Sequence, residues 1–185
     1  YKGDLRHYDI SVGRELSGEE LEEIREQVLA KRAKMRAMHL LQDRDYTEEG
    51  MRRKLKDGLY PDEIIEEAIA YVKQFHYIDD ARYARSYIQS HALSLSARQI
   101  TEKLKNKGIR SDVISAAFAS CEEESGLDAQ ELEMRIVKEQ MLKKMRTMGS
   151  LKEEKQKLFA YLYRKGFSYS AIEKAYESCT ADHDV

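Results

Sequence analysis

The amino-acid sequence predicts an all-α protein: an elongated tandem array of three three-helix repeats, preceded by a short tail and a long helix. The composition favours helices, because the 185 residues include one Pro and no Trp, while Glu, Lys, Arg, Ala, Leu and Met are abundant. Apolar residues recur at helical spacing, and one pair of short helices returns three times with the same internal spacing. Short helices of this kind cannot bury their apolar faces alone, so we expect the copies to stack.

The first segment, residues 1–16, is expected to form a tail or a remnant strand. It contains β-leaning residues and two glycines, Gly3 and Gly13, and it starts with Tyr1 rather than Met. We therefore interpret it as an N-terminal tail or the remnant of a truncated segment.

A long helix is expected next, from Ser17 to about Asp43. Ser17-Gly-Glu-Glu20 is a capping box, in which the serine hydroxyl accepts one free backbone N–H group and the Glu20 carboxylate accepts another. The first turns are acidic and the later turns are basic, which matches the helix dipole at both ends. An apolar stripe is formed by Leu21, Ile24, Val28, Met35 and Met38. We expect this stripe to pack on the rest of the protein, with a coiled-coil partner as the alternative.

The three repeats share one spacing. A Leu lies ten residues before an Ile in the pairs Leu55–Ile65, Leu104–Ile114 and Leu162–Ile172. An apolar residue lies four positions before each Leu, at Met51, Ile100 and Leu158, and an Ala lies three positions after each Ile, at Ala68, Ala117 and Ala175. This interval is typical of a helix, a glycine with positive φ, a tight turn and a second helix. The glycine stops are placed at Gly58, Gly108 and Gly166, and the segments at residues 17–76, 77–124 and 125–180, with a C-terminal tail at 181–185.

Each repeat also carries its own helix-start signals. Pro61 suits a first helical position, Asp79 suits an N-cap, and Ser96-Ala-Arg-Gln99 is a second capping box. A further helix is expected to begin at Asp128 and to carry an apolar stripe of Met134, Val137, Met141, Met145 and Met148. We interpret this stripe as core, although a methionine stripe can also serve as an adaptable binding surface.

The residues that carry catalysis or bind metals in other proteins form no recognisable pattern. The five His are scattered, Cys121 and Cys179 are isolated, and there is neither a glycine-rich phosphate loop nor a nucleophile elbow. Asp79-Asp80 resembles a catalytic carboxylate pair, but a helix start explains both residues. We therefore expect a non-enzymatic protein without metal or cofactor. The few thiols favour the reducing cytoplasm, and no apolar run approaches the roughly 18 residues that a membrane span requires.

Basic residues concentrate on the middle helices of the repeats, although the formal net charge is only −2. Residues 96–110 carry five bases against one acid, and residues 150–166 carry five bases against two acids. Stacking would align such helices into a stripe that follows a phosphate backbone or the acidic wall of a protein groove. Ordinary solvated helix faces are the alternative. The candidate partner-binding residues are Arg52, Arg53, Lys56, Arg98, Lys103, Lys107, Arg110, Lys155 and Arg164.

Three motifs stand out in the first two repeats. They are Tyr77-Ile-Asp-Asp-Ala-Arg-Tyr-Ala84, then Ser96-x-x-Gln99-Ile-x-x-x-Leu104 followed by Lys107-Gly-Ile109, and an upstream motif from Ala37 to Leu55. In combination they resemble the RecX family of recombinase regulators, except that Gly50-Met51 stands where that family more often has Glu-Leu.

The resemblance implies a three-helix unit repeated three times in a curved body. It also implies binding to the filament of the RecA recombinase and inhibition of its ATPase, coprotease and strand-exchange activities, with effects on recombination, DNA repair and the SOS response. It supplies no catalytic residue. We expect a monomer that contacts DNA mainly within the filament and does not bind membranes. A nucleic-acid-binding module without a recombinase partner, and an adaptor for an unrelated protein, are the alternatives.

Overall fold

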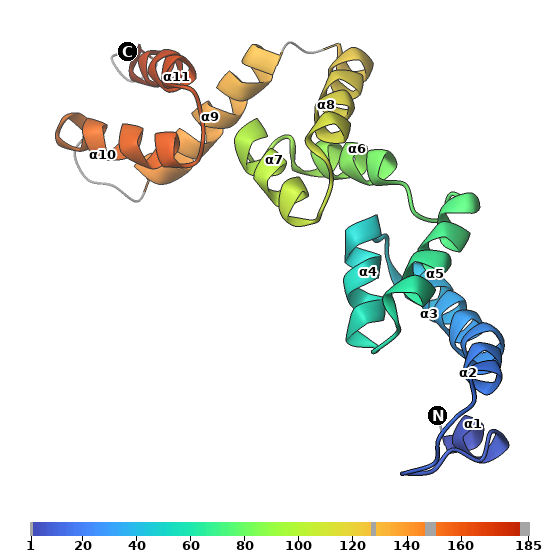
Figure 1. Cartoon of the computed structure of the whole chain (residues 1–185). Coiled ribbons are helices and arrows are strands. Elements are labelled where there is room, and N and C mark those ends of the chain that lie inside the picture. The colour runs from blue at the N-terminus through green and yellow to red at the C-terminus, as the bar shows by residue number, and fades with distance from the viewer. Residues whose placement is uncertain (1, 127–128, 147–150, 182–185) are drawn as a thin grey trace. The chain divides into compact units, whose positions relative to one another are not determined.

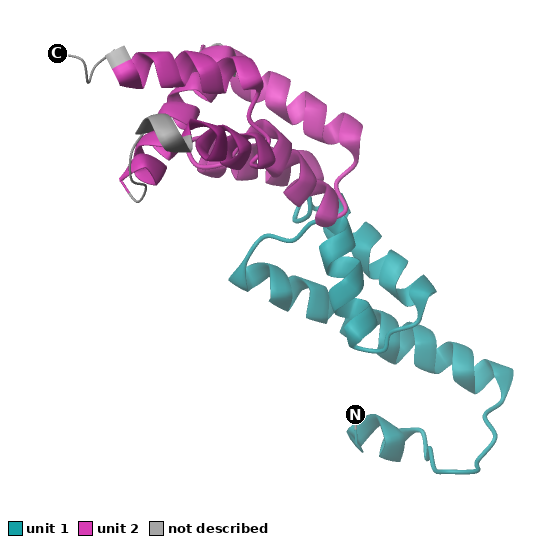
Figure 2. Cartoon of the chain, turned by 90° about the vertical axis from the view of Figure 1, so that its left-hand side faces the viewer, with its two compact units in different colours: residues 1–79 teal, residues 80–185 magenta. Residues whose placement is uncertain are grey.

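A computed structural model describes residues 2–126, 129–146 and 151–181, and this described part is helical and contains no β-strand. The helices follow one another along the chain as Figure 1 shows. The chain separates into two compact units, residues 1–79 and residues 80–185 (Figure 2). The all-α prediction is therefore confirmed, and each unit is described by itself.

The first unit holds the tail, the long helix and two further helices. Its elements are α1 (Lys2–His7), α2 (Gly18–Ile24), a π-helical segment η1 (Arg25–Ala30), α3 (Lys31–Asp43), α4 (Glu48–Asp57) and α5 (Asp62–Gln74). The expectation of a remnant strand near the N-terminus was wrong, because α1 is a short helix. Its Asp4 carboxylate lies 2.6 Å from the Arg32 guanidinium of α3.

The long helix starts as predicted. The Glu20 backbone N–H donates to the Ser17 hydroxyl at 3.1 Å, and the Ser17 N–H donates back to the Glu20 carboxylate at 2.9 Å. The helix then passes through η1 without leaving helical backbone angles and ends at Asp43.

The predicted apolar stripe on this helix does not face the core. Leu21 is 48% exposed and Met35 is 70% exposed, whereas Ala33 and Ala37 are fully buried. Small side chains allow α3 to pack closely on α5. The π segment also changes the phase of the helix, because each of its turns holds more residues than an α turn. The stripe was therefore assigned to the wrong face.

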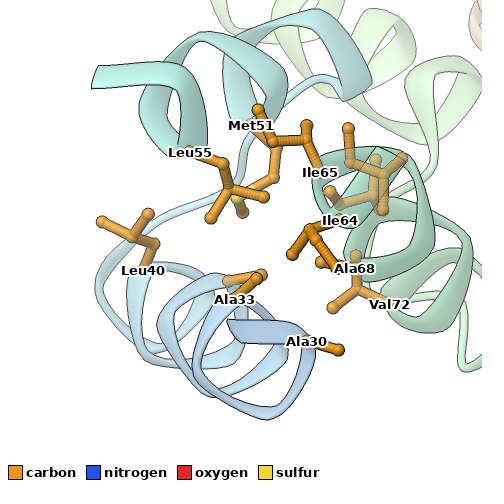
Figure 3. Close-up of a cluster of buried hydrophobic side chains, with 12 residues drawn as sticks. Ala30, Ala33, Leu40, Met51, Leu55, Ile64, Ile65, Ala68 and Val72 are labelled. Atoms are coloured by element: carbon orange, nitrogen blue, oxygen red, sulfur yellow. The ribbon is translucent and has the colours of Figure 1, made fainter. Parts of the chain in front are cut away.

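The core of the first unit is built where α3, α4 and α5 meet. Figure 3 shows the buried side chains that these helices and the end of η1 contribute to this cluster. Those labelled there are Ala30, Ala33, Leu40, Met51, Leu55, Ile64, Ile65, Ala68 and Val72.

The second unit contains two three-helix domains. The second three-helix domain of the chain consists of α6 (Asp80–His91), α7 (Ala97–Asn106) and α8 (Ser111–Ser125), and the third of α9 (Ala129–Met145), α10 (Leu151–Arg164) and α11 (Tyr169–Ala181). In each, the first and third helices pack on one another around a separate apolar cluster. The helix α6 begins directly after Asp79, where the sequence predicts an N-cap.

The repeat spacing is confirmed by burial. All twelve positions that define it have at most 3% of their surface exposed. They are Met51, Leu55, Ile65, Ala68, Ile100, Leu104, Ile114, Ala117, Leu158, Leu162, Ile172 and Ala175. The methionine stripe of α9 also contributes to the core: Val137 and Met141 are fully buried and Met145 is partly buried, while Met134 is 38% exposed. Asp128 and Met148 lie outside the described residues.

Two predicted positions at the turn of the first repeat need correction. Gly58 has a φ of −82°, and the left-handed residue is Leu59, with a φ of +60°. Leu59 lies four residues after the Leu of the repeat spacing, which is the place that Gly108 and Gly166 occupy in the other repeats. Both of those glycines have a φ of +86°. Pro61 is the N-cap of α5 rather than its first helical residue.

Candidate partner-binding surface

Arg52, the first predicted surface cation, lies within a network of carboxylates in the first unit. Its guanidinium donates to Glu66 at 2.6 Å, to Glu49 at 2.8 Å and to Glu48 at 3.1 Å, and Glu48 also accepts from Lys73 at 2.6 Å. The bond to Glu66 raises the pKa of Arg52 and lowers the pKa of the Glu66 carboxyl. Arg52 thus joins α4 to α5 within the fold.

The other two predicted cations of this unit are more accessible. Arg53 pairs with Glu49 at 3.1 Å and its side chain is 61% exposed. Lys56 lies 3.4 Å from Asp62 and is 68% exposed. Both charged groups face solvent on α4, and each lies beside an acidic side chain.

In the second domain, three predicted cations are exposed around α7. Arg98 lies 3.3 Å from Glu102 and is 69% exposed. Arg110, at the N-cap of α8, makes a bidentate pair with Asp112 and is 79% exposed. Lys103 is also exposed. Arg98 and Arg110 can exchange their exposed ion pairs for those of a partner at little cost.

Lys107 differs from them because it lies over aromatic rings. Its Nζ atom is 5.5 Å from the centre of the Tyr83 ring and 5.8 Å from that of Tyr87. Tyr87 in turn stacks on His91 with ring centres 4.0 Å apart. Such contacts stabilise an ammonium group at the ring face. Sequence reasoning missed this cluster, although the spacing of Tyr83, Tyr87 and His91 along one helix face would have indicated it.

The third domain holds the last two predicted cations. Lys155 lies 4.7 Å from the ring centre of Tyr176 and 5.3 Å from that of Phe159. Arg164 is exposed at the end of α10 and donates to the Ala160 carbonyl at 3.3 Å.

The end of α10 meets the start of α7, which joins the two basic segments of the second unit. The Ser96 hydroxyl donates to the Lys165 carbonyl at 2.7 Å while it accepts the Gln99 N–H at 3.2 Å. The negative C-terminal end of the α10 dipole therefore faces the positive N-terminal end of the α7 dipole. Gly166 has a φ of +86°, and a Cβ atom there would lie 3.0 Å from the Arg98 Cβ atom and 3.1 Å from the Ser96 Oγ atom, so this close approach of the two helices favours glycine. Arg98 and Arg164 consequently flank one junction.

In the part of the chain that the structure describes, no three His, Cys, Asp or Glu side chains are grouped to hold a metal ion. None of the helices described is long and apolar enough to cross a membrane.

Comparison with known proteins assigns all three repeats to one family. Models of the first, second and third three-helix domains of RecX match residues 33–71, 79–117 and 131–176. The chain is 30% identical to the regulatory protein RecX of Caldanaerobacter subterraneus subsp. tengcongensis over 167 residues, which cover 90% of this chain and 80% of the relative. It is 31% identical to that of Serratia proteamaculans over 164 residues, which cover 76% of this chain and 94% of the relative.

Solved structures share the fold. A crystal structure of a regulatory protein RecX superposes with a TM-score of 0.73 and 24% identity, covering 95% of this chain and 85% of the other. RecX from Lactobacillus salivarius gives a TM-score of 0.68 at 20% identity, covering 81% and 96%. Each matched family domain contains one copy of the Leu–Ile pair found in the sequence. This chain therefore belongs to the RecX family of regulatory proteins.

Proposed function

We propose that this protein binds the filament of the RecA recombinase and inhibits its ATPase, coprotease and strand-exchange activities, and so limits recombination and DNA repair. It acts by binding rather than by catalysis, as a monomer in the cytoplasm. Membership of a family of regulatory proteins supports the proposal. The observation that carries it is the junction of α10 and α7, which presents exposed cations from two domains in one place.

The contact between α7 and α10 suits this role. The Ser96–Lys165 bond and the close approach at Gly166 bring basic side chains of two domains together in the unbound protein, so less ordering is needed when they bind. Several weak contacts on one body also raise the effective concentration of each for the next. A series of modest ion pairs is therefore sufficient to occupy the groove of a filament made of identical protomers.

The test reverses two exposed charges, Lys103→Glu together with Arg110→Glu. We expect inhibition of the DNA-dependent ATPase of RecA to weaken about tenfold, since each surface charge contributes up to about 1 kcal/mol. The rate is measured with stoichiometric and with substoichiometric amounts of protein, which separates coating of the groove from capping of filament ends. Circular dichroism checks that helicity is unchanged.

The matched control is Lys143→Glu together with Lys174→Glu, which makes the same change in net charge on exposed positions of α9 and α11. We expect this control to inhibit as the unaltered protein does. If the α7–α8 variant bound and inhibited as well as the control, the surface assignment would be wrong.

The second candidate function is nucleic-acid binding without a recombinase, favoured by the exposed Lys103 and Lys105 of α7. In that case the logarithm of affinity for bare duplex falls with the logarithm of salt concentration, with a slope near −0.9 for each phosphate contacted. Weak binding to bare DNA together with tight binding to RecA-coated DNA would support the first candidate and reject the second.

A further inference from the structure

A pocket of about 450 Å³ lies between the second and third three-helix domains, and no part of the proposed function uses it. This junction pocket is lined mainly by apolar side chains of both domains. Prominent among them are Ile88, Phe118 and Cys121 from the second domain, and Leu132, Ile136 and Phe167 from the third. Its volume falls within the range of roughly 300–1,000 Å³ that is usual for ligand sites.

The pocket exists because the two domains are held together along one edge. Each domain completes its own apolar cluster. They contact each other at Ser96, Lys165 and Gly166, where a hydroxyl meets a carbonyl and a glycine meets a side chain, and the Gln140 amide lies 3.5 Å from the Ser94 carbonyl. Ser96 and Gly166 line the pocket. Leu93, which also lines it, is 60% exposed.

The charged groups at the pocket are acidic. Glu122 and Glu133 line it, and no Lys, Arg or His is among the described side chains that do. The Glu133 carboxylate is held in place, since it accepts the Ser168 N–H at 2.8 Å and the Ser168 hydroxyl at 2.9 Å. An apolar floor with fixed negative charge beside it favours an apolar group that carries positive charge next to it.

We propose that the junction pocket binds a basic segment of a partner protein, which inserts one aromatic side chain and places the adjacent Lys or Arg against Glu122 and Glu133. An aromatic anchor in a pocket with charges at its rim is the usual form of a high-affinity contact between proteins. This contact goes beyond the proposed function, because its surface is apolar and acidic whereas the proposed filament-binding surface is basic. The two are therefore tested separately.

Cys121 offers a direct readout, because it is one of the residues that line the pocket. The probe is the peptide acetyl-Lys-Phe-Arg-amide, and the measurement is the rate at which iodoacetamide alkylates Cys121, followed by mass spectrometry. At a peptide concentration of about four times Kd we expect alkylation to slow about fivefold, because about one fifth of the pockets are then free. Cys179 is only 3% exposed and reports any unfolding.

Two further peptides separate the contributions. Acetyl-Glu-Phe-Glu-amide keeps the aromatic ring with the opposite charge, and acetyl-Lys-Ala-Arg-amide keeps the charge without the ring. We expect neither to protect Cys121. Equal protection by the acidic peptide, or no protection by the basic aromatic peptide, would overturn the proposal. Protection that grows with protein concentration in the absence of peptide would assign the pocket to a second copy of the chain instead.

The variant Glu122→Gln with Glu133→Gln removes the two charges and keeps the shape of the side chains. We expect it to lose most of the protection by the basic aromatic peptide. Its control is Glu173→Gln with Glu177→Gln, the same charge change on exposed positions of α11, which should keep full protection. Undiminished protection in the pocket variant contradicts the charge assignment.

Discussion

At the scale of single residues, the turn of each repeat depends on one left-handed backbone position. Glycine fills it at Gly108 and Gly166, whereas the first repeat places Leu59 there with a φ of +60°. The Leu59 side chain is 91% exposed, so it gains almost no burial. A left-handed conformation costs an L-residue about 1–2 kcal/mol. The first unit therefore carries local strain that the other two repeats avoid.

Replacement Leu59→Gly should stabilise the protein by about 0.5–1 kcal/mol, because relief of the backbone strain outweighs the greater freedom of glycine in the unfolded chain. Urea unfolding followed by circular dichroism measures the gain. Leu93→Gly is the control, since Leu93 is also an exposed turn residue but is absent from the positive-φ positions. A gain of equal size in both variants would show that loss of an exposed Leu, and not backbone strain, is responsible.

At the scale of the elements, the network around Arg52 ties α4 to α5. Hydrogen bonds to Arg52 lower the pKa of the Glu49 and Glu66 carboxyls, and a hydrogen bond to Lys73 lowers that of Glu48. Carboxylates whose pKa is lower in the folded state stabilise it above their unfolded pKa of roughly 4.3. This stabilisation is lost as the pH falls through the lowered values of the folded state.

The variant Arg52→Met tests this network. At neutral pH we expect a loss of about 1–2 kcal/mol, because several partly exposed ion pairs break together. Between about pH 5 and pH 3 the unaltered protein should lose more stability than the variant, so their urea midpoints converge. Arg53→Met removes the pair with Glu49, on a more exposed side chain, and should change stability by less than about 0.5 kcal/mol. A gap that stays constant down to pH 3 would argue against the network.

The long helix shows how an element can be predicted while its buried face is not. Its start at Ser17 follows from a capping box that the structure confirms, and it ends at Asp43, as expected. Its buried side consists of Ala30, Ala33, Ala37 and Leu40 rather than the larger apolar residues. Close packing on α5 selects small side chains, and this choice depends on a helix more than twenty residues away. Hydrophobic spacing alone does not contain that information.

At the scale of the whole molecule, Ser96 connects a local signal to domain packing. It is the N-cap of α7, and its hydroxyl also donates to the Lys165 carbonyl, 69 residues along the chain. Ser17 heads the same kind of capping box but is exposed. The two serines therefore form a matched pair that differs in the contact between domains.

Ser17→Ala should cost about 1 kcal/mol, the usual value for loss of an N-cap. Ser96→Ala should cost about 2 kcal/mol, because it also leaves a carbonyl at the domain junction without its donor. Urea unfolding gives both values, and amide hydrogen exchange at the start of α7 locates the second loss. Equal costs for the two substitutions would mean that the Ser96–Lys165 bond adds nothing to stability.

By itself, the sequence determined the helical class, the three repeats and the buried residues of their shared Leu–Ile spacing, because periodicity, capping boxes and turn glycines act between residues close in the chain. The basic segments could likewise be located by counting charges. Only the tertiary structure decided which of those cations are held within the fold, as Arg52 is, and which are exposed, as Lys103 is. It alone brought Ser96 to Lys165 and left an apolar pocket with acidic groups beside it. These features arise from contacts between distant segments, which depend on how completed helices pack and are not encoded in any local spacing.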